Sequence, residues 1–423
     1  MNIPEFKTLI IGAGVSGMTI AHGLYGEDNL VLFEKEDHAG GLSTMYKSSN
    51  YKFDYAGHYF HFQANTRIKP FLEQFASFRS FKRKSRTFLL GKYIPFPIQF
   101  HLSHLPASIK NRIFEEMKEE KKEIKEFENL NDFLLFHFGE TLYHLFFKPF
   151  QEKYYLLGLQ ELAANMDKGS IPVPDRNQVV EGMKGKIFTG AGYNATIYYP
   201  RGGLDSFINK MASPLNDIIH YNEEVMAIDS VKKEVITSKG IYKYERLIST
   251  MPLNHLLRIL TPCDKFPSPQ ELQYRSTLLV NVVLERKRRR FHWAYLAESE
   301  FPFYRVGIYA AHSLPSCYLE RNILPGSKFN ADELKQEVEF TLGKLGLIVK
   351  ASEIKHLDAK IIPVSYVVFD KKWRQIVPSC LEKLKELDIY SIGRYGTWNY
   401  SSMGNDIHDA FHLIERFRGK SPL

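Results

Sequence analysis

The sequence predicts an α/β protein built from two or three packed units, and three observations support this fold class. A short apolar run at residues 8–11 leads directly into a glycine-rich turn and then a helix-forming segment, which is the order of a parallel βαβ unit. Short alternating strands are expected between residues 215 and 250. The chain has 423 residues, which exceeds the usual size of a single domain.

Composition and charge are those of an ordinary globular protein. Hydrophobic residues make up 44% and charged residues 25% of the sequence, which excludes disordered, collagen-like and coiled-coil proteins. The chain carries 56 Lys and Arg against 48 Asp and Glu, a net charge of +8. This modest excess fits anionic small molecules or an acidic membrane surface, and we expect no nucleic-acid partner.

The cysteines and the apolar segments predict the cellular compartment. Cys263, Cys317 and Cys380 stand far apart, which argues against a disulfide framework and a zinc site and indicates a reducing cytosol. No run of about 18 apolar residues exists, and the first strand begins too early to leave room for a cleaved signal. We therefore expect a cytoplasmic protein, and no metal-ligand cluster is found in the sequence.

The stretch GAGVSG after the first strand is the first candidate site. Gly12 permits a tight turn, Gly14 lets the backbone approach a pyrophosphate, and Gly17 allows close packing of the helix on the strand. The N-terminus of the helix would then offer free N–H groups to the phosphates. A second strand at 30–33 ends in Glu34, whose carboxylate would accept hydrogen bonds from ribose hydroxyls. The alternative is that these glycines only shape a turn.

The residues after this strand distinguish NAD from FAD. The stretch 34–43 resembles the second glycine motif of the glutathione-reductase-type FAD fold, which amine oxidases share. Its pair Gly40 and Gly41 would let the chain pass beside the phosphates and ring of a flavin, so FAD is favoured. A solvent-exposed glycine loop is the alternative. None of the three cysteines matches a covalent flavin attachment, so we expect FAD to be held noncovalently.

The rest of the chain predicts the domain organisation. Residues 93–106 are rich in proline and predict an extended loop, followed by helices at 107–129 and 130–147. A strand at 389–393 and a helix at 405–418 would complete the nucleotide-binding domain. We expect three regions: a discontinuous FAD-binding domain (1–90, 205–265 and 380–423), a largely helical insertion (91–204) and an antiparallel-sheet substrate domain (266–379).

Four separated segments resemble UDP-galactopyranose mutase and its FAD-binding homologues, namely residues 94–99, 148–154, 303–306 and 393–403. The wider superfamily of protoporphyrinogen oxidase and the amine oxidases shares the N-terminal glycines and the stretch 199–204. The resemblance implies a glutathione-reductase-type Rossmann-like FAD domain with a helical insertion and an antiparallel-sheet substrate domain. It also implies a nucleotide-sugar substrate of surface polysaccharide synthesis, attacked by N5 of the reduced flavin without net redox change.

The same resemblance implies roles for individual residues. Arg305 and Tyr400 match residues that grip the substrate diphosphate, and a planar guanidinium suits two phosphate oxygens at once. His58 matches a histidine beside the flavin. A structural salt bridge for Arg305, a core position for Tyr400 and a structural role for His58 are the alternatives. Further cofactor-binding residues implied by the resemblance are Val225, Gly393, Arg394 and Met403.

Two positions depart from the mutase pattern. Ser402 stands where the family has an acidic residue, and Tyr198 stands where eukaryotic-type mutases carry a second diphosphate-binding arginine. Losing that cation would cost a few kcal/mol, because charge-assisted hydrogen bonds contribute about 1.5–3 kcal/mol each. The alternative function is therefore an FAD-dependent oxidoreductase of the amine oxidase or protoporphyrinogen oxidase type.

Two basic clusters, at 82–86 and 286–290, are not explained by this function. We expect solvated loops, with peripheral contact to anionic lipid as the alternative. The sequence does not predict an oligomeric state.

Overall fold

The structure, a computed structural model, describes the following residues: 3–61, 67–118, 126–164, 171–189, 191, 195–287, 291–309, 311 and 314–419. The chain divides into two compact units. Unit 1 contains Met1–Ser80, Tyr198–Gln273 and Lys372–Leu423, and unit 2 contains Phe81–Ile197 and Tyr274–Lys371. The three-region division expected from the sequence, with boundaries at 90, 204, 265 and 379, stays a prediction.

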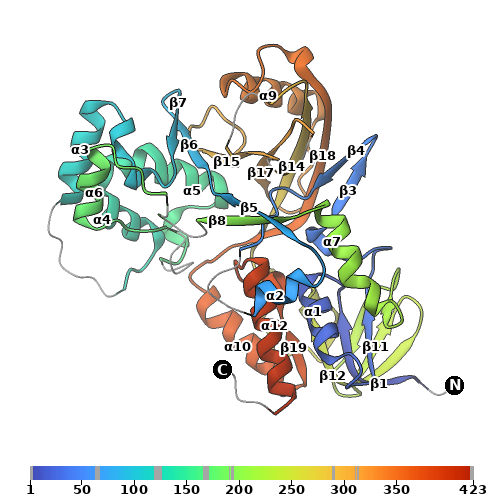
Figure 1. Cartoon of the computed structure of the whole chain (residues 1–423). Helices are drawn as coiled ribbons and strands as arrows, with labels where there is room; N and C mark the ends of the chain where they lie inside the picture. Colours follow the sequence, from blue (N-terminus) through green and yellow to red (C-terminus); the bar gives the residue numbers. More distant parts are fainter. Residues whose placement is uncertain are drawn as a thin grey trace. The chain divides into compact units, whose positions relative to one another are not determined.

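An eight-stranded sheet forms the centre of unit 1 (Figure 1). Its strand β1 (Glu5–Ile11) pairs in parallel with β2 (Leu30–Phe33) and with β12 (Ile241–Ser249). Every side chain of β2 is buried, as expected for a strand inside a parallel sheet. β12 also pairs in parallel with β19 (Ile389–Ser391), which confirms the strand predicted at 389–393. The remaining strands are β9 (Ile219–His220), β10 (Val225–Asp229), β11 (Glu234–Thr237) and β13 (Leu260–Thr261).

Helices from both ends of the chain pack together in unit 1. α1 (Val15–Leu24) follows the glycine turn and packs against α12 (Met403–Phe417). The helix predicted at 405–418 is confirmed, and it begins two residues earlier because Ser402 caps it. The other elements are α2 (Ile68–Glu73), α7 (Gly203–Ala212), α8 (Leu253–Ile259), α10 (Trp373–Glu386), α11 (Gly393–Gly396) and the pair β3 (Met45–Ser48) and β4 (Tyr51–Asp54).

A seven-stranded sheet forms the centre of unit 2, in the order β18-β14-β17-β16-β15-β6-β7. It is antiparallel except for the pair β6 and β15. Its strands are β6 (Ser85–Leu89), β7 (Lys92–Pro95), β14 (Tyr274–Leu284), β15 (Trp293–Leu296), β16 (Arg305–Ile308), β17 (Ser316–Ile323) and β18 (Ile354–Val367). The extended loop predicted at 93–106 is wrong in two places: β7 runs to Pro95, and short 3₁₀ helices follow at Ile98–Phe100 and Leu102–His104. An edge strand tolerates proline there, since its outer N–H groups need no partner.

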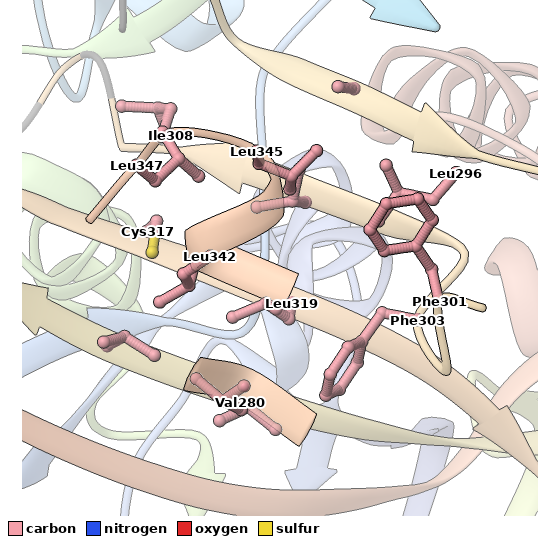
Figure 2. Packing of buried hydrophobic residues seen from close by; sticks show 14 of the residues in the cluster. Val280, Leu296, Phe301, Phe303, Ile308, Cys317, Leu319, Leu342, Leu345 and Leu347 are labelled. Carbon is pink, nitrogen blue, oxygen red and sulfur yellow. The ribbon is translucent and has the colours of Figure 1, made fainter. Parts of the chain in front are cut away.

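The core of unit 2 lies between this sheet and α9 (Ala331–Lys344). Leu334, Val338 and Leu342 are fully buried at helical spacing on one face of α9. They pack with sheet residues such as Val280 and Leu319 (Figure 2). The helical part of unit 2 contains α3 (Ala107–Lys118), α4 (Leu130–Leu142), a π-helical turn (Tyr143–Phe147), α5 (Lys148–Tyr155) and α6 (Arg176–Met183).

Some of the sequence predictions fall outside the described residues. These are residues 119–125 of the helix predicted at 107–129, and residues 288–290 of the second basic cluster. Residues 126–129 are described and are not helical, so the end of that predicted helix is wrong, and Asn129 caps α4 instead. The chain crosses between the units within β5 (Phe78–Lys82) and β8 (Thr196–Pro200), and again at residues 273/274 and 371/372. Within the described ranges, no helix is both long enough and apolar enough to cross a membrane.

The packing of α9 gives a test of the unit 2 core. Leu342→Ala removes a fully buried side chain, and we expect a loss of about 2–5 kcal/mol in unfolding free energy, because a cavity remains. Lys335→Ala, at an exposed position of the same helix, should change it by less than about 0.5 kcal/mol. Urea unfolding of the two purified variants measures the difference, and equal midpoints would contradict the packing.

Candidate functional site

The glycine turn of unit 1 joins β1 to α1 with very little space around it. A Cβ atom on Gly17 would lie 2.0 Å from the carbonyl oxygen of Gly12, and one on Gly12 would lie 2.3 Å from Oγ1 of Thr250. A Cβ atom on Gly14, by contrast, would meet no atom within 4 Å. Gly14 also supplies no side-chain cap to the N–H groups at the start of α1. This is a cradle that an anionic group can enter.

The second glycine pair lies directly beside this turn. The N–H of Gly40 donates to the carbonyl of Ala13 at 2.8 Å, and Gly14 and Gly40 form a parallel bridge. Gly40 has a φ of 108° and Gly41 a φ of 55°, which side chains rarely allow. The structure thus brings the two predicted glycine motifs together, and a Cβ atom on Gly41 would lie 3.9 Å from the Cα atom of Gly14.

Glu34 lies at the end of β2 and holds the glycine turn. Its buried carboxylate accepts hydrogen bonds from the N–H of Ala13 at 2.7 Å and from the N–H of Glu36 at 3.0 Å. Burial raises the pKa of Glu34, while these two N–H groups lower it. Two carboxylate oxygens offer about four acceptor positions, so two are left for ribose hydroxyls.

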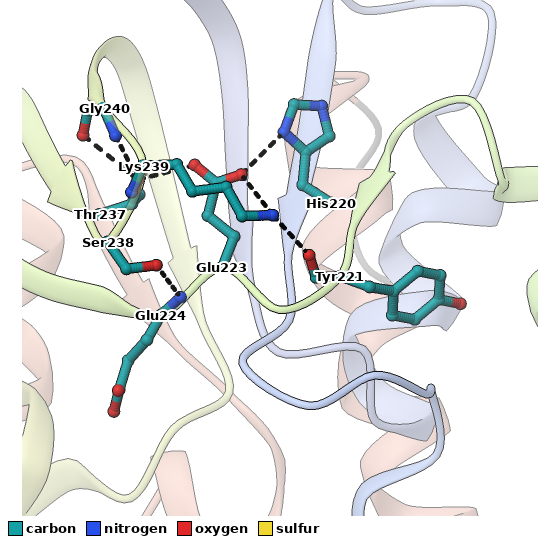
Figure 3. A network of polar contacts seen from close by, with 8 residues as sticks. All are labelled: His220, Tyr221, Glu223, Glu224, Thr237, Ser238, Lys239 and Gly240. Carbon is teal, nitrogen blue, oxygen red and sulfur yellow. Dashed lines mark hydrogen bonds and ion pairs between the residues drawn. The ribbon is translucent and has the colours of Figure 1, made fainter.

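A polar network that the sequence analysis missed positions the segment next to Glu34 (Figure 3). The N–H of Glu223 donates to the carbonyl of Glu34 at 2.9 Å. The Glu223 carboxylate, which is 3% exposed, accepts from Oγ1 of Thr237 at 2.7 Å and lies 3.2 Å from Nδ1 of His220. These contacts hold the chain as it enters β10 at Val225, the position implied to contact the cofactor. No motif in the sequence links these residues, which lie on separate strands and turns.

The segment 393–403 approaches the two glycine motifs from the C-terminal end of the chain. A Cβ atom on Gly393 would lie 2.7 Å from Oγ of Ser16 in α1. The hydroxyl of Ser43, two residues after Gly41, donates to Sδ of Met403 at 3.3 Å. Ser402, which replaces an acidic residue of the family pattern, caps α12 by accepting from the N–H of Asn405. Gly393 and Met403 therefore lie beside both glycine motifs.

His58 lies in a segment that is held at several points. The hydroxyl of Tyr199 donates to the carboxylate of Asp54 at 2.9 Å, just before this segment. Phe60 and Tyr198 exchange two backbone hydrogen bonds of 2.9 Å. A Cβ atom on Gly404 would lie 2.6 Å from the carbonyl oxygen of His61. The structure thus connects the segment of His58 with Tyr198 and with the start of α12.

Arg394 and Tyr400 form one cluster at the start of α12. The Arg394 guanidinium lies over the Tyr400 ring, 4.3 Å from its centroid, and donates to the carbonyl of Ser401 at 3.0 Å. The Ser401 hydroxyl donates to the buried carboxylate of Asp406. Burial raises the pKa of Asp406 to about 6, although Ser401 and Arg394 oppose the shift.

Arg305 lies in unit 2, where it forms a buried ion pair. Its Nε and Nη2 atoms donate to the two carboxylate oxygens of Glu320, its neighbour on β17, and Nη2 also donates to the hydroxyl of Tyr366 at 3.2 Å. The side chains of Arg305 and Glu320 are 17% and 3% exposed. A salt bridge is therefore present at Arg305. No hydrogen bond from Nη1 is found among the described residues.

Aromatic rings surround this ion pair and connect three of the segments that resemble the mutases. The Tyr154 ring lies 5.0 Å from that of Tyr304, whose hydroxyl is 3.3 Å from Glu320. The Tyr295 ring lies 4.6 Å from that of Phe96 and 5.3 Å from that of Phe150. Segments 94–99, 148–154 and 303–306 therefore meet inside unit 2, although they are far apart in the sequence.

The fold and the glycine cradle together define a dinucleotide-binding protein of the Rossmann type. The profile of a family described as flavin containing amine oxidoreductase matches residues 15–319. The chain belongs to this family. The residues present fit the cofactor that this implies, because the cradle at Gly14 and the two remaining acceptor positions of Glu34 suit a pyrophosphate and a ribose. The protein is an FAD-dependent enzyme.

Solved structures share this fold over the whole chain. A reduced UDP-galactopyranose mutase is 22% identical, with a TM-score of 0.89 over 98% of this chain and 96% of the other. A putative protoporphyrinogen oxidase from Exiguobacterium sp. 255-15 is 15% identical, with a TM-score of 0.74 over 99% of both chains. A fatty acid isomerase from P. acnes that produces CLA is 12% identical, with a TM-score of 0.66 over 97% of this chain and 98% of the other. These likenesses confirm the predicted fold class.

The position of Glu34 gives a test of the cofactor site. Glu34→Ala should weaken FAD binding by about 1.5–3 kcal/mol for each charge-assisted hydrogen bond that is lost. Glu36→Ala, at an exposed neighbouring carboxylate, should leave binding unchanged. Fluorescence titration of the apoproteins with FAD measures both affinities. Equal affinity of Glu34→Ala and the unaltered protein would mean that other groups hold the ribose.

Asp406 gives a test by pH. Its pKa of about 6 in the folded state exceeds the ordinary 3.8, so folding takes up a proton between these values and stability falls as the pH rises through this range. Asp406→Asn removes this effect and should be more stable than the unaltered protein at pH 7.5, by up to roughly 3 kcal/mol. Melting temperatures of the FAD-loaded proteins between pH 4 and pH 8 measure it. Parallel profiles for both proteins would contradict the assignment.

Proposed function

We propose that the protein binds a nucleotide sugar and rearranges the sugar without net oxidation, in the manner of a UDP-galactopyranose mutase. The observation that carries this proposal is the likeness to the mutase structure, which covers 98% of this chain at a TM-score of 0.89. Three of the four segments that resemble the mutases support it as well, because they meet in unit 2 near Arg305. The substrate class rests on the chemistry of these residues.

Arg305 and its surroundings suit a nucleoside diphosphate. Glu320 holds the guanidinium in one orientation, so Nη1 can meet a phosphate oxygen without reorganisation. The nearby rings of Phe150 and Tyr154 stack on each other at 6.0 Å and offer aromatic faces for a nucleobase. For Tyr400, which belongs to unit 1, a hydroxyl contact to a substrate phosphate is proposed on the resemblance to the mutases alone.

The chain divides the chemistry between the cofactor and its own side chains. Bound FAD, once reduced, would supply the nucleophile that displaces the diphosphate from the sugar. The glycine cradle at Gly14 and the Glu34 carboxylate hold the FAD phosphates and ribose, and Val225, Gly393, Arg394 and Met403 complete this site. Arg305 stabilises the negative charge that develops on the leaving diphosphate. His58 is proposed to lie beside the flavin ring.

A second candidate function is net oxidation of an amine or a porphyrinogen. The family description and the likeness to a putative protoporphyrinogen oxidase favour it. Tyr198 favours it too, because its side chain offers no positive charge for a diphosphate. Under this alternative, the Arg305–Glu320 pair is structural and the tyrosine rings contact an apolar substrate.

The cellular setting is also part of the proposal. We place the enzyme in the cytoplasm, in surface polysaccharide synthesis. The thiols of Cys317 and Cys380 are buried, burial raises their pKa to about 12, and Cys263 is exposed; none of the three forms a disulfide. Lipid contact by the basic clusters stays a prediction.

The proposal predicts a dependence on reduction without consumption of reductant. The dithionite-reduced protein should interconvert a pyranose and furanose nucleotide sugar, and the flavin should stay reduced over many turnovers. Arg305→Ala should lose on the order of 2–4 kcal/mol of transition-state stabilisation, the range for one donor to a developing charge. Chromatography of the nucleotide sugars gives kcat/KM. Arg321→Ala, on β17 of the same sheet, breaks an ion pair with Glu337 of α9 and should keep its activity.

Two further results would contradict the mutase proposal or replace it. If no nucleotide sugar is converted and UDP leaves the flavin spectrum unchanged, the mutase proposal fails. If an amine or a porphyrinogen then bleaches the oxidised flavin in the absence of oxygen, the oxidoreductase function replaces it.

A further inference from the structure

Two histidines on α12 converge at a place that the proposed function does not use. His408 and His412 are one helical turn apart, and their side chains are 43% and 33% exposed. Their Nε2 atoms lie 3.1 Å from each other, with the ring planes at 73°. Two neutral imidazoles can meet in this way only if one Nε2 carries a proton and the other does not.

The separation of the two nitrogens also matches the bite of one metal ion. Metal–nitrogen bonds of about 2.05 Å to both atoms give an N–metal–N angle of about 100° at a separation of 3.1 Å. This angle lies between the square-planar and tetrahedral values of about 90° and 109° that Cu²⁺ and Zn²⁺ prefer. The rings therefore need little movement to chelate an ion.

A carboxylate lies near the Nδ1 atom of each histidine ring. Nδ1 of His408 lies 3.8 Å from a carboxylate oxygen of Asp409, and Nδ1 of His412 lies 3.8 Å from Oε2 of Glu415. Arg67 donates to the other oxygen of Glu415 at 2.6 Å, while Oε2 is buried and accepts no hydrogen bond among the described residues. Carboxylates in this position favour the tautomer with the proton on Nδ1, which leaves Nε2 for a metal.

We propose that His408 and His412 form a two-nitrogen binding site for a borderline divalent transition-metal ion, with water completing its coordination. The site is independent of the proposed function. Among the described residues, no group of three or more His, Cys, Asp and Glu side chains is placed to hold a metal, so the chelate has two protein ligands. Imidazole nitrogens select Cu²⁺, Ni²⁺ and Zn²⁺ over Mg²⁺ and Ca²⁺, and Cu²⁺ should bind most tightly.

Electron paramagnetic resonance of the FAD-loaded, oxidised protein with Cu²⁺ tests the site directly. We expect one Cu²⁺ per chain with hyperfine coupling to two imidazole nitrogens at pH 7.5. The variant H408Q/H412Q should lose the two-nitrogen signal. His144→Gln, at an exposed histidine beside Glu140, should keep it.

A second measurement uses Zn²⁺, which has no redox chemistry. Zn²⁺ should raise the melting temperature of the unaltered protein and of His144→Gln, and not that of H408Q/H412Q. Equal FAD content and equal melting temperatures without metal would show that the double variant is folded. If the double variant binds Cu²⁺ with the same spectrum, or if the unaltered protein binds none, the proposal is overturned and the pair is a histidine–histidine hydrogen bond.

Discussion

The hydrogen bond from the Ala13 N–H to the Glu34 carboxylate is the contact on which the cofactor site of this protein depends. It ties the end of β2 to the turn between β1 and α1, at a place where water is excluded. A buried carboxylate is stable there only because backbone N–H groups satisfy it, and the same carboxylate keeps acceptor positions for a ribose. One side chain thus shapes the turn and, in the proposed function, also holds the ribose of the cofactor.

The nucleotide-binding part of the fold could be predicted from the sequence because its determinants are local. Gly12, Gly14 and Gly17 follow a buried strand without interruption, and Glu34 follows the next strand. The backbone explains each glycine: Gly12 has a positive φ, a Cβ atom on Gly14 would meet no atom within 4 Å, and Gly17 packs closely against Gly12. The final strand and helix were predictable for the same reason, since their hydrophobic pattern is read within a short window.

The partners of the candidate substrate residues could not be predicted in this way. Glu320 contacts Arg305 because β16 and β17 pair in an antiparallel register that places the two residues opposite each other. The sequence alone does not predict the register between two strands of a buried sheet. His220 and Glu223 are joined to Thr237 by the folding of three short strands. Tyr198 stood out as a missing arginine, while its backbone pairing with Phe60 became visible only in the structure.

Unit 1 is built from three separate segments of the chain, so its parts are synthesised at different times. β1 and α1 are synthesised first, but Gly393 and Met403, which pack beside the glycine turns, are synthesised several hundred residues later. At about 5–20 residues per second, roughly 400 residues take on the order of 20–80 s to translate. β12 becomes available to the first βαβ segment after residue 249, but β19 and α12 follow only near the end of that time. The packing around the glycine turns is therefore finished only after the segment 393–403 has been synthesised, because Gly393 lies against Ser16 and Met403 against Ser43.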